Sequence, residues 1–253
     1  MCVLAHPDDE SLGTGGTLAK YAAEGVETYV LTATRGERGR FLEGVERPAP
    51  DVVGETREAE LRAAGKELGV REVTQLGFPD GALDSVDPVA AQDVIAAQLR
   101  RVQPHVVITF GPEGAYGHPD HIAISQFTTA AIVRAADRNY TVSKLYYIAW
   151  CMTRWTAYQK ALKKLVATVD GVEREVIPTP EWEITTRIDT SAVWTTALRA
   201  VQCHRTQTSI YKNLESLPHD EQRTLWGVQE FYRAFSLVNG GRTRESDLFE
   251  GLR

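Results

Sequence analysis

The chain has 253 residues, of which 43% are hydrophobic and 25% are charged, a balance typical of a globular protein with a substantial core. The formal net charge is -6 with both signs interspersed, which argues against a nucleic-acid-binding patch and against a basic helix on a membrane surface. We therefore expect a small molecule as the partner, with no nucleic acid and no membrane, and the sequence leaves a homo-oligomer open.

Cysteine usage points to a reducing compartment. The three cysteines, Cys2, Cys151 and Cys203, are odd in number and far apart, so they fit neither a disulfide framework nor a cysteine zinc site. No apolar run approaches the roughly 20 residues of a membrane span. We expect a cytoplasmic protein. Because the chain opens almost directly on an apolar strand, the sequence leaves open whether native residues precede Met1.

The first 150 residues alternate short apolar runs with amphipathic stretches, a pattern that predicts right-handed βαβ units and a parallel sheet. We expect a long polar loop, functional or mobile, over residues 35–54. The predicted strands cover residues 2–5, 28–32, 72–76, 105–110 and 145–150. The predicted helices cover residues 12–23, 55–68, 87–102 and 119–136.

The alternation ends near residue 150. Beyond it we predict a hairpin over residues 166–176 that turns at Asp170-Gly171, and a tail that frays after Asn239. The other predicted elements are helices over residues 156–164, 191–203 and 219–228 and a strand over 182–188.

The predicted fold class is therefore α/β, a doubly wound, Rossmann-like, mostly parallel sheet in the strand order 3-2-1-4-5. Residues 1–150 would form the core. Residues 151–253 would form a C-terminal α+β extension that carries the hairpin, packs on the core as part of the same domain and contributes to the ligand pocket.

Two polar motifs follow strands of this core. The run from Ala5 to Glu10, Ala-His-Pro-Asp-Asp-Glu, follows the first strand, and Gly-His-Pro-Asp-His at residues 117–121 follows the fourth. In the order 3-2-1-4-5 these strands are neighbours at the point where strand order reverses, where such sheets bind ligands. Imidazoles and carboxylates without cysteine suit zinc or another divalent first-row metal. The groups exceed three metal ligands, and the surplus could provide the base and acid of a hydrolase.

Each motif alone has a simpler interpretation. Asp8, Asp9 and Glu10 could be a helix start with acidic residues against the helix dipole. His118-Pro119 could likewise be a helix start with proline at the first helical position. Their joint placement at neighbouring strand ends favours a single site.

Together the two motifs resemble those of the PIG-L/LmbE-like family of metal-dependent N-deacetylases, over about residues 1–150. The resemblance implies that His6, Asp9 and His121 hold the metal, Zn2+ with Fe2+ as the alternative. It implies that Asp8 is the general base, and that His118 is the electrophile or general acid.

The resemblance also suggests supporting roles. Asp120 would tune His118, and Tyr116 would offer a hydroxyl to the oxyanion. Arg57 and Asp80 resemble residues that bind sugar hydroxyls, although Arg57 could lie on a solvated helix face and Asp80 could be a turn residue.

A segment near the C-terminus is also similar to the family. His204 is followed three residues later by Gln207, as in a C-terminal signature. The alternative, which we favour from the sequence, is that His204 only interacts with the dipole at the end of a helix.

The predicted function is hydrolysis of an N-acetyl group from an amino sugar or an N-acetylglucosaminyl conjugate. One alternative is an amidase for a larger thiol–sugar conjugate. Others are a non-catalytic metal-binding or nucleotide-binding module. Three consecutive acidic residues, Asp8 to Glu10, disfavour a phosphate ligand at the first motif.

Overall fold

The structure is a computed structural model, and it describes residues 1–162, 166–169, 171–175, 178–207, 213–214, 216–241 and 243–253. The main sheet consists of β1 (Cys2–Leu4), β2 (Tyr29–Thr34), β3 (Glu72–Phe78), β4 (Val106–Thr109), β5 (Lys144–Ala149), β8 (Thr186–Asp189) and β9 (Val228–Ser236). These strands lie in the order β3-β2-β1-β4-β5-β9-β8. Strands β1 to β5 are parallel. The predicted α/β class and the order 3-2-1-4-5 are therefore confirmed.

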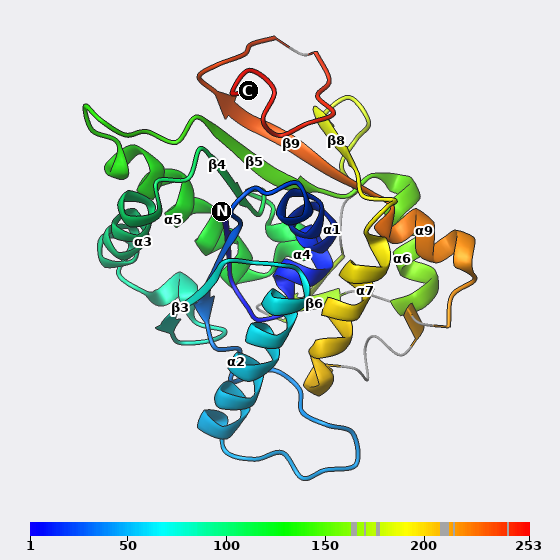
Figure 1. The fold of residues 1–253 in the computed structure, drawn as a ribbon. Coiled ribbons are helices and arrows are strands. Elements are labelled where there is room, and N and C mark those ends of the chain that lie inside the picture. Colours follow the sequence, from blue (N-terminus) through cyan, green and yellow to red (C-terminus); the bar gives the residue numbers. More distant parts are fainter. Residues whose placement is uncertain (163–165, 170, 176–177, 208–212, 215, 242) are drawn as a thin grey trace.

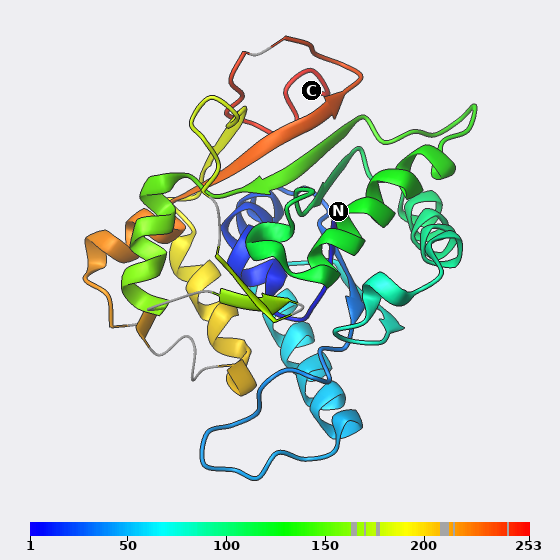
Figure 2. The ribbon, with the colours of Figure 1, turned by 180° about the vertical axis from the view of Figure 1, so that it is seen from behind.

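Helices cover the sheet on two sides. They are α1 (Asp9–Ala23), α2 (Pro50–Glu67), α3 (Pro88–Val102), α4 (Gly114–Gly117), α5 (Pro119–Ala135), α6 (Met152–Leu162), α7 (Trp194–Cys203) and α9 (His219–Trp226). Helices α3 and α5 pack together in one layer, and α1, α2 and α7 pack together in another (Figures 1 and 2). None of the helices in the described ranges is both long and apolar enough to cross a membrane.

The sheet is wider than predicted because it continues past residue 150. Strand β9 was not predicted, yet it pairs antiparallel with the whole of β5 and carries β8 on its other edge. Its run from Phe231 to Phe235 is rich in aromatic residues, which favour strands.

The C-terminal tail does not fray as predicted. Glu245 is 3% exposed and accepts hydrogen bonds from Lys144 Nζ at 2.7 Å and from Tyr146 Oη at 2.8 Å. Leu248 is buried in the main core. The prediction was wrong because it considered only the charge and glycine content of the tail. In the structure, Lys144 and Tyr146 of β5 donate hydrogen bonds to Glu245 in the tail.

Several element boundaries also differ from the predictions. Helix α1 begins at Asp9 rather than residue 12, and α2 begins at Pro50, a favourable first helical residue, rather than residue 55. The predicted hairpin is confirmed as β6 (Val166–Val169) and β7 (Val172–Glu175), which pair antiparallel. Asp170 in its turn lies outside the described residues, as do the last two residues of the helix predicted over 156–164.

Candidate metal centre and active site

The fold brings the two polar motifs together. Strands β1 and β4 are parallel neighbours, with Cys2 opposite Ile108. The first motif leaves the end of β1 and starts α1, while the second starts α5. At that second helix start His118 is the N-cap residue, and its Nδ1 accepts a hydrogen bond from the backbone N–H of Asp120 at 3.1 Å.

Three donor groups form a compact triangle at this point. His6 Nδ1 lies 3.2 Å from His121 Nε2 and 3.7 Å from an Asp9 carboxylate oxygen, and His121 Nε2 lies 3.5 Å from the other Asp9 oxygen. Ligands about 2.1 Å from a tetrahedral zinc ion would be about 3.4 Å apart. The spacing therefore fits a divalent metal. The imidazole nitrogens of His6, His118 and His121 also lie within 4.8 Å of one another.

The other nitrogen of His6 is fixed by two carboxylates. His6 Nε2 lies 3.0 Å from Asp120 Oδ2 and 3.2 Å from Asp80 Oδ1. Burial disfavours the charged imidazole, but the hydrogen bonds to Asp120 and Asp80 outweigh it and raise the pKa of His6 to about 10. Burial also opposes ionisation of Asp80, yet its contact with His6 lowers its pKa to about 2. These carboxylates direct Nδ1 of His6 toward the triangle.

This arrangement differs from the roles expected for Asp80 and Asp120. The carboxylate of Asp120 faces His6 rather than His118, and it accepts the backbone N–H groups of Gly81 and Leu83 at 2.7 and 2.9 Å. Asp80 is 5% exposed and contacts His6, although it does line the cavity described below. Both carboxylates therefore orient a candidate metal ligand.

Asp8 lies beside the triangle in a strained conformation. Its φ of 115° and ψ of -26° are in the left-handed region, which costs a residue other than glycine about 1–3 kcal/mol. Asp8 Oδ2 accepts a hydrogen bond from Arg57 Nη2 at 3.2 Å. Strain of this kind often marks a functional position.

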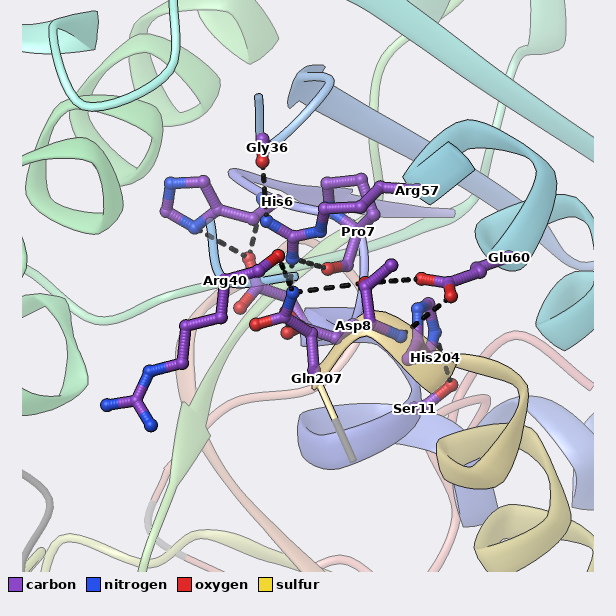
Figure 3. Close-up of polar contacts among 12 residues, drawn as sticks. His6, Pro7, Asp8, Ser11, Gly36, Arg40, Arg57, Glu60, His204 and Gln207 are labelled. Carbon is purple, nitrogen blue, oxygen red and sulfur yellow. Dashed lines mark hydrogen bonds and ion pairs between the residues drawn. The ribbon is translucent and has the colours of Figure 1, made fainter. Parts of the chain in front are cut away.

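Arg57 is buried, so the solvated helix face considered for it is wrong. The residue is 4% exposed in α2, and its guanidinium also donates to the carbonyl groups of Pro7 and Gly36 (Figure 3). Arg57 thus ties α2 to the first motif and to the loop after β2. It also lines the cavity, on the side of Asp8.

His118 is arranged to donate a hydrogen bond at neutral pH. Burial and the nearby positive charge of His6 lower the pKa of His118 to about 4, so its imidazole is neutral. Because Nδ1 accepts from the backbone, the ring proton lies on Nε2. The Tyr116 ring stands 5.8 Å from the His118 ring, centroid to centroid, and burial raises the pKa of its phenol.

Apart from Asp120, these groups border a cavity of about 310 Å³. Its other lining residues come from both halves of the chain. The polar side includes Arg38 and Gln207. The apolar side is formed by Leu12, Phe110, Ile148, Trp150, Trp155 and Tyr158.

Two residues of the site were not assigned from the sequence. Glu10 and His204 are both fully buried, and His204 Nε2 lies 2.7 Å from Glu10 Oε1. His204 does follow α7, but its side chain pairs with Glu10, so the favoured dipole interpretation misses its main contact. The signal was available, since each residue belongs to one of the motifs noted above.

The comparisons with known proteins agree on the family. The model of the PIG-L family, described as GlcNAc-PI de-N-acetylase, matches residues 1–132. A relative from Rhodococcus jostii RHA1, named 1D-myo-inositol 2-acetamido-2-deoxy-alpha-D-glucopyranoside deacetylase, is 34% identical over 100% of this chain and 97% of its own length.

Solved structures share the fold over nearly the whole chain. The conserved protein TT1542 of Thermus thermophilus has a TM-score of 0.65 and 26% identity, covering 96% of this chain and 98% of its own. The 4-carboxy-2-hydroxymuconate hydratase of Pseudomonas putida KT2440 has a TM-score of 0.69 at 20% identity, over 95% and 98%. Since the name of this last protein describes a hydratase, the fold alone does not decide the reaction. The family match and the full-length identity together place the chain in the PIG-L family.

Proposed function

We propose that the protein is a metal-dependent hydrolase that removes the N-acetyl group from an amino sugar. The observation that carries this proposal is the triangle of His6, Asp9 and His121 donor atoms beside Asp8 and His118. The name of the Rhodococcus jostii relative makes an N-acetylglucosaminyl inositol the first substrate to test.

The donor set supports zinc as the metal, with iron(II) as the alternative, because two imidazoles and a carboxylate suit either ion. His6, Asp9 and His121 would hold it. A divalent ion bound there lowers the pKa of a coordinated water and polarises the acetyl carbonyl. The remaining chemistry belongs to side chains of the chain itself.

Asp8 acts as the general base in this proposal. It lines the cavity next to Asp9, and Arg57 fixes one of its carboxylate oxygens. A carboxylate held in this way can accept the proton of the attacking water as the water adds to the amide carbonyl. Arg57 is then a positioning residue for Asp8, and because it also lines the cavity, the sugar contact expected from the sequence stays a prediction.

His118 stabilises the oxyanion that forms at the carbonyl. Its neutral ring presents the Nε2 proton as a donor, and Tyr116 offers a phenolic hydroxyl on the same side of the cavity. The proton that Asp8 took from the water can then pass to the amine nitrogen, so that the C–N bond breaks and the amine leaves. The apolar side, with Trp155 and Tyr158 from α6, makes the C-terminal part of the chain a contributor to substrate binding.

The test is acetate release from N-acetylglucosaminyl inositol and from a panel of N-acetylated sugars. We expect release that a chelator abolishes and that added zinc or iron(II) restores. A metal-loaded, folded protein that releases no acetate from any member of the panel would contradict the proposal.

A further inference from the structure

A buried carboxylate holds the backbone N–H of Asp8, while Arg57 holds its side chain. Glu10 is fully buried, and its Oε2 accepts a hydrogen bond from the backbone N–H of Asp8 at 3.0 Å. The side chain reaches back over the first turn of α1 to make this contact. Without it, the N–H of a strained residue would lose its acceptor.

The second oxygen of Glu10 is held by two donors. Oε1 accepts from Ser11 Oγ at 2.5 Å and lies 2.7 Å from His204 Nε2. The Nδ1 atom of His204 has no hydrogen-bond partner among the described residues, so the ring proton is best placed on Nε2, pointing to Glu10. His204 thus fixes the orientation of the carboxylate that holds Asp8.

The segment that carries His204 is itself anchored to the core around the site. Thr206 donates to the carboxylate of Glu60 in α2, from its backbone N–H at 2.8 Å and from its hydroxyl at 2.7 Å. Gln207 Nε2 donates to the carbonyl of Arg40 at 3.0 Å (Figure 3). The segment that follows His204 is therefore fixed to α2 and to the loop between β2 and α2.

We propose that Glu10 and His204 are positioning residues that hold the Asp8 backbone in its left-handed conformation, and thereby keep its carboxylate at the reacting water. This inference rests on the proposed role of Asp8 as the general base. It assigns a function to the end of the first motif and to the C-terminal His-x-x-Gln segment together.

The kinetic test compares Glu10→Ala and His204→Leu with their conservative counterparts Glu10→Gln and His204→Gln. Gln at position 10 can still accept from the Asp8 N–H, and Gln at position 204 can still donate to Glu10. Because a misplacement of about 1 Å can cost roughly 100-fold in rate, we expect kcat to fall by about 100-fold in the first pair, with KM and metal content unchanged. The Gln variants should recover most of that loss.

Glu245→Gln is the matched control. Glu245 pairs with Lys144 at 2.7 Å, with both side chains at most 1% exposed, which matches the burial and distance of the Glu10–His204 pair. This pair lies away from the cavity, so the control should lower Tm without lowering kcat. A loss of kcat in Glu245→Gln equal to that in Glu10→Ala, or no loss in Glu10→Ala, would overturn the proposal.

A crystal structure of Glu10→Ala separates this inference from the proposed function. We expect Asp8 to leave the left-handed region in that variant. If the wild-type protein releases no acetate, the proposed function fails, but the conformation of Asp8 still tests the positioning role. Asp8 remaining near a φ of 115° in Glu10→Ala would overturn the inference whatever the activity.

Discussion

His6 shows how one side chain can link the metal site to its surroundings. Its Nδ1 joins the donor triangle, while its Nε2 is held by Asp80 and Asp120. Carboxylates that hold the outer nitrogen of a histidine ligand fix its orientation and its tautomer. The burial of Asp120 is then explained by this contact together with its two backbone donors.

Replacing Asp120 should weaken metal binding without removing a ligand. We expect Asp120→Asn to lower metal affinity by about 10–100-fold, because the amide cannot reproduce the charge that holds His6. Competition with a chromophoric chelator measures the change. Asp84→Asn, at an exposed position shortly after Asp80 in the chain, is the control and should bind metal like the wild type. Equal affinities in all three proteins would rule out the orienting role.

Neighbouring aspartates should have separable roles. Asp8→Ala should keep the metal and lose activity by about 100-fold to 10,000-fold, the usual contribution of a general base. Asp9→Ala should lose the metal itself. Metal analysis alongside acetate release distinguishes the two variants, and a fully active Asp8→Ala would remove Asp8 from the mechanism.

The limits of sequence reasoning are clearest for Asp120 and Arg57. Residue type and spacing were enough to nominate them for the site. Their partners were not predictable, because His6 and Asp120 are 114 residues apart and Arg57 reaches Asp8 across 49 residues. Which atom meets which depends on side-chain directions that only the packed fold determines.

At the level of elements, the parallel core was predictable because each βαβ unit has a local signal. Apolar runs located strands β1 to β5 well. Helical periodicity, together with the proline at the start of α3, located the helices between them. Strand β9 was missed because its pairing with β5 joins segments far apart in the sequence, and its short aromatic run alone does not show that partner. The preceding helix α9 has the stronger amphipathic pattern. The helix predicted over residues 219–228 therefore extends into the first residue of β9.

Strand β9 should contribute strongly to stability. Phe231 is fully buried in the main core beside Tyr146, so Phe231→Ala should lower the free energy of unfolding by about 3–5 kcal/mol. Tyr232→Ala is the matched control, because that side chain is 41% exposed and should cost about 1 kcal/mol or less. Urea denaturation followed by circular dichroism compares them. Similar losses for the two variants would contradict the placement of β9.

At the scale of the whole molecule, the site depends on distant parts of one chain. Residues from His6 to Gln207 line a single cavity. Strands that precede residue 150 and strands that follow it belong to one sheet. The end of the chain returns to β5 through Glu245. Folding of the C-terminal part and formation of the site should therefore be coupled.

Metal binding should depend steeply on pH because it displaces protons. The pKa of His6 is raised to about 10, so a metal must replace a proton there at neutral pH, and affinity should rise with pH. We expect the dissociation constant to fall about tenfold per pH unit above about pH 7. Burial raises the pKa of Asp9 to about 7, so the dependence should steepen below that pH. A dissociation constant independent of pH would contradict this linkage.

The most direct test of the metal centre is anomalous diffraction from crystals of the zinc-loaded protein. The account predicts one strong peak about 2.0–2.2 Å from His6 Nδ1, His121 Nε2 and an Asp9 oxygen, with Asp8 and His118 facing its open side. A peak on the opposite nitrogen of His6, ligated by Asp80 and Asp120, would contradict the assignment of ligands and of the base.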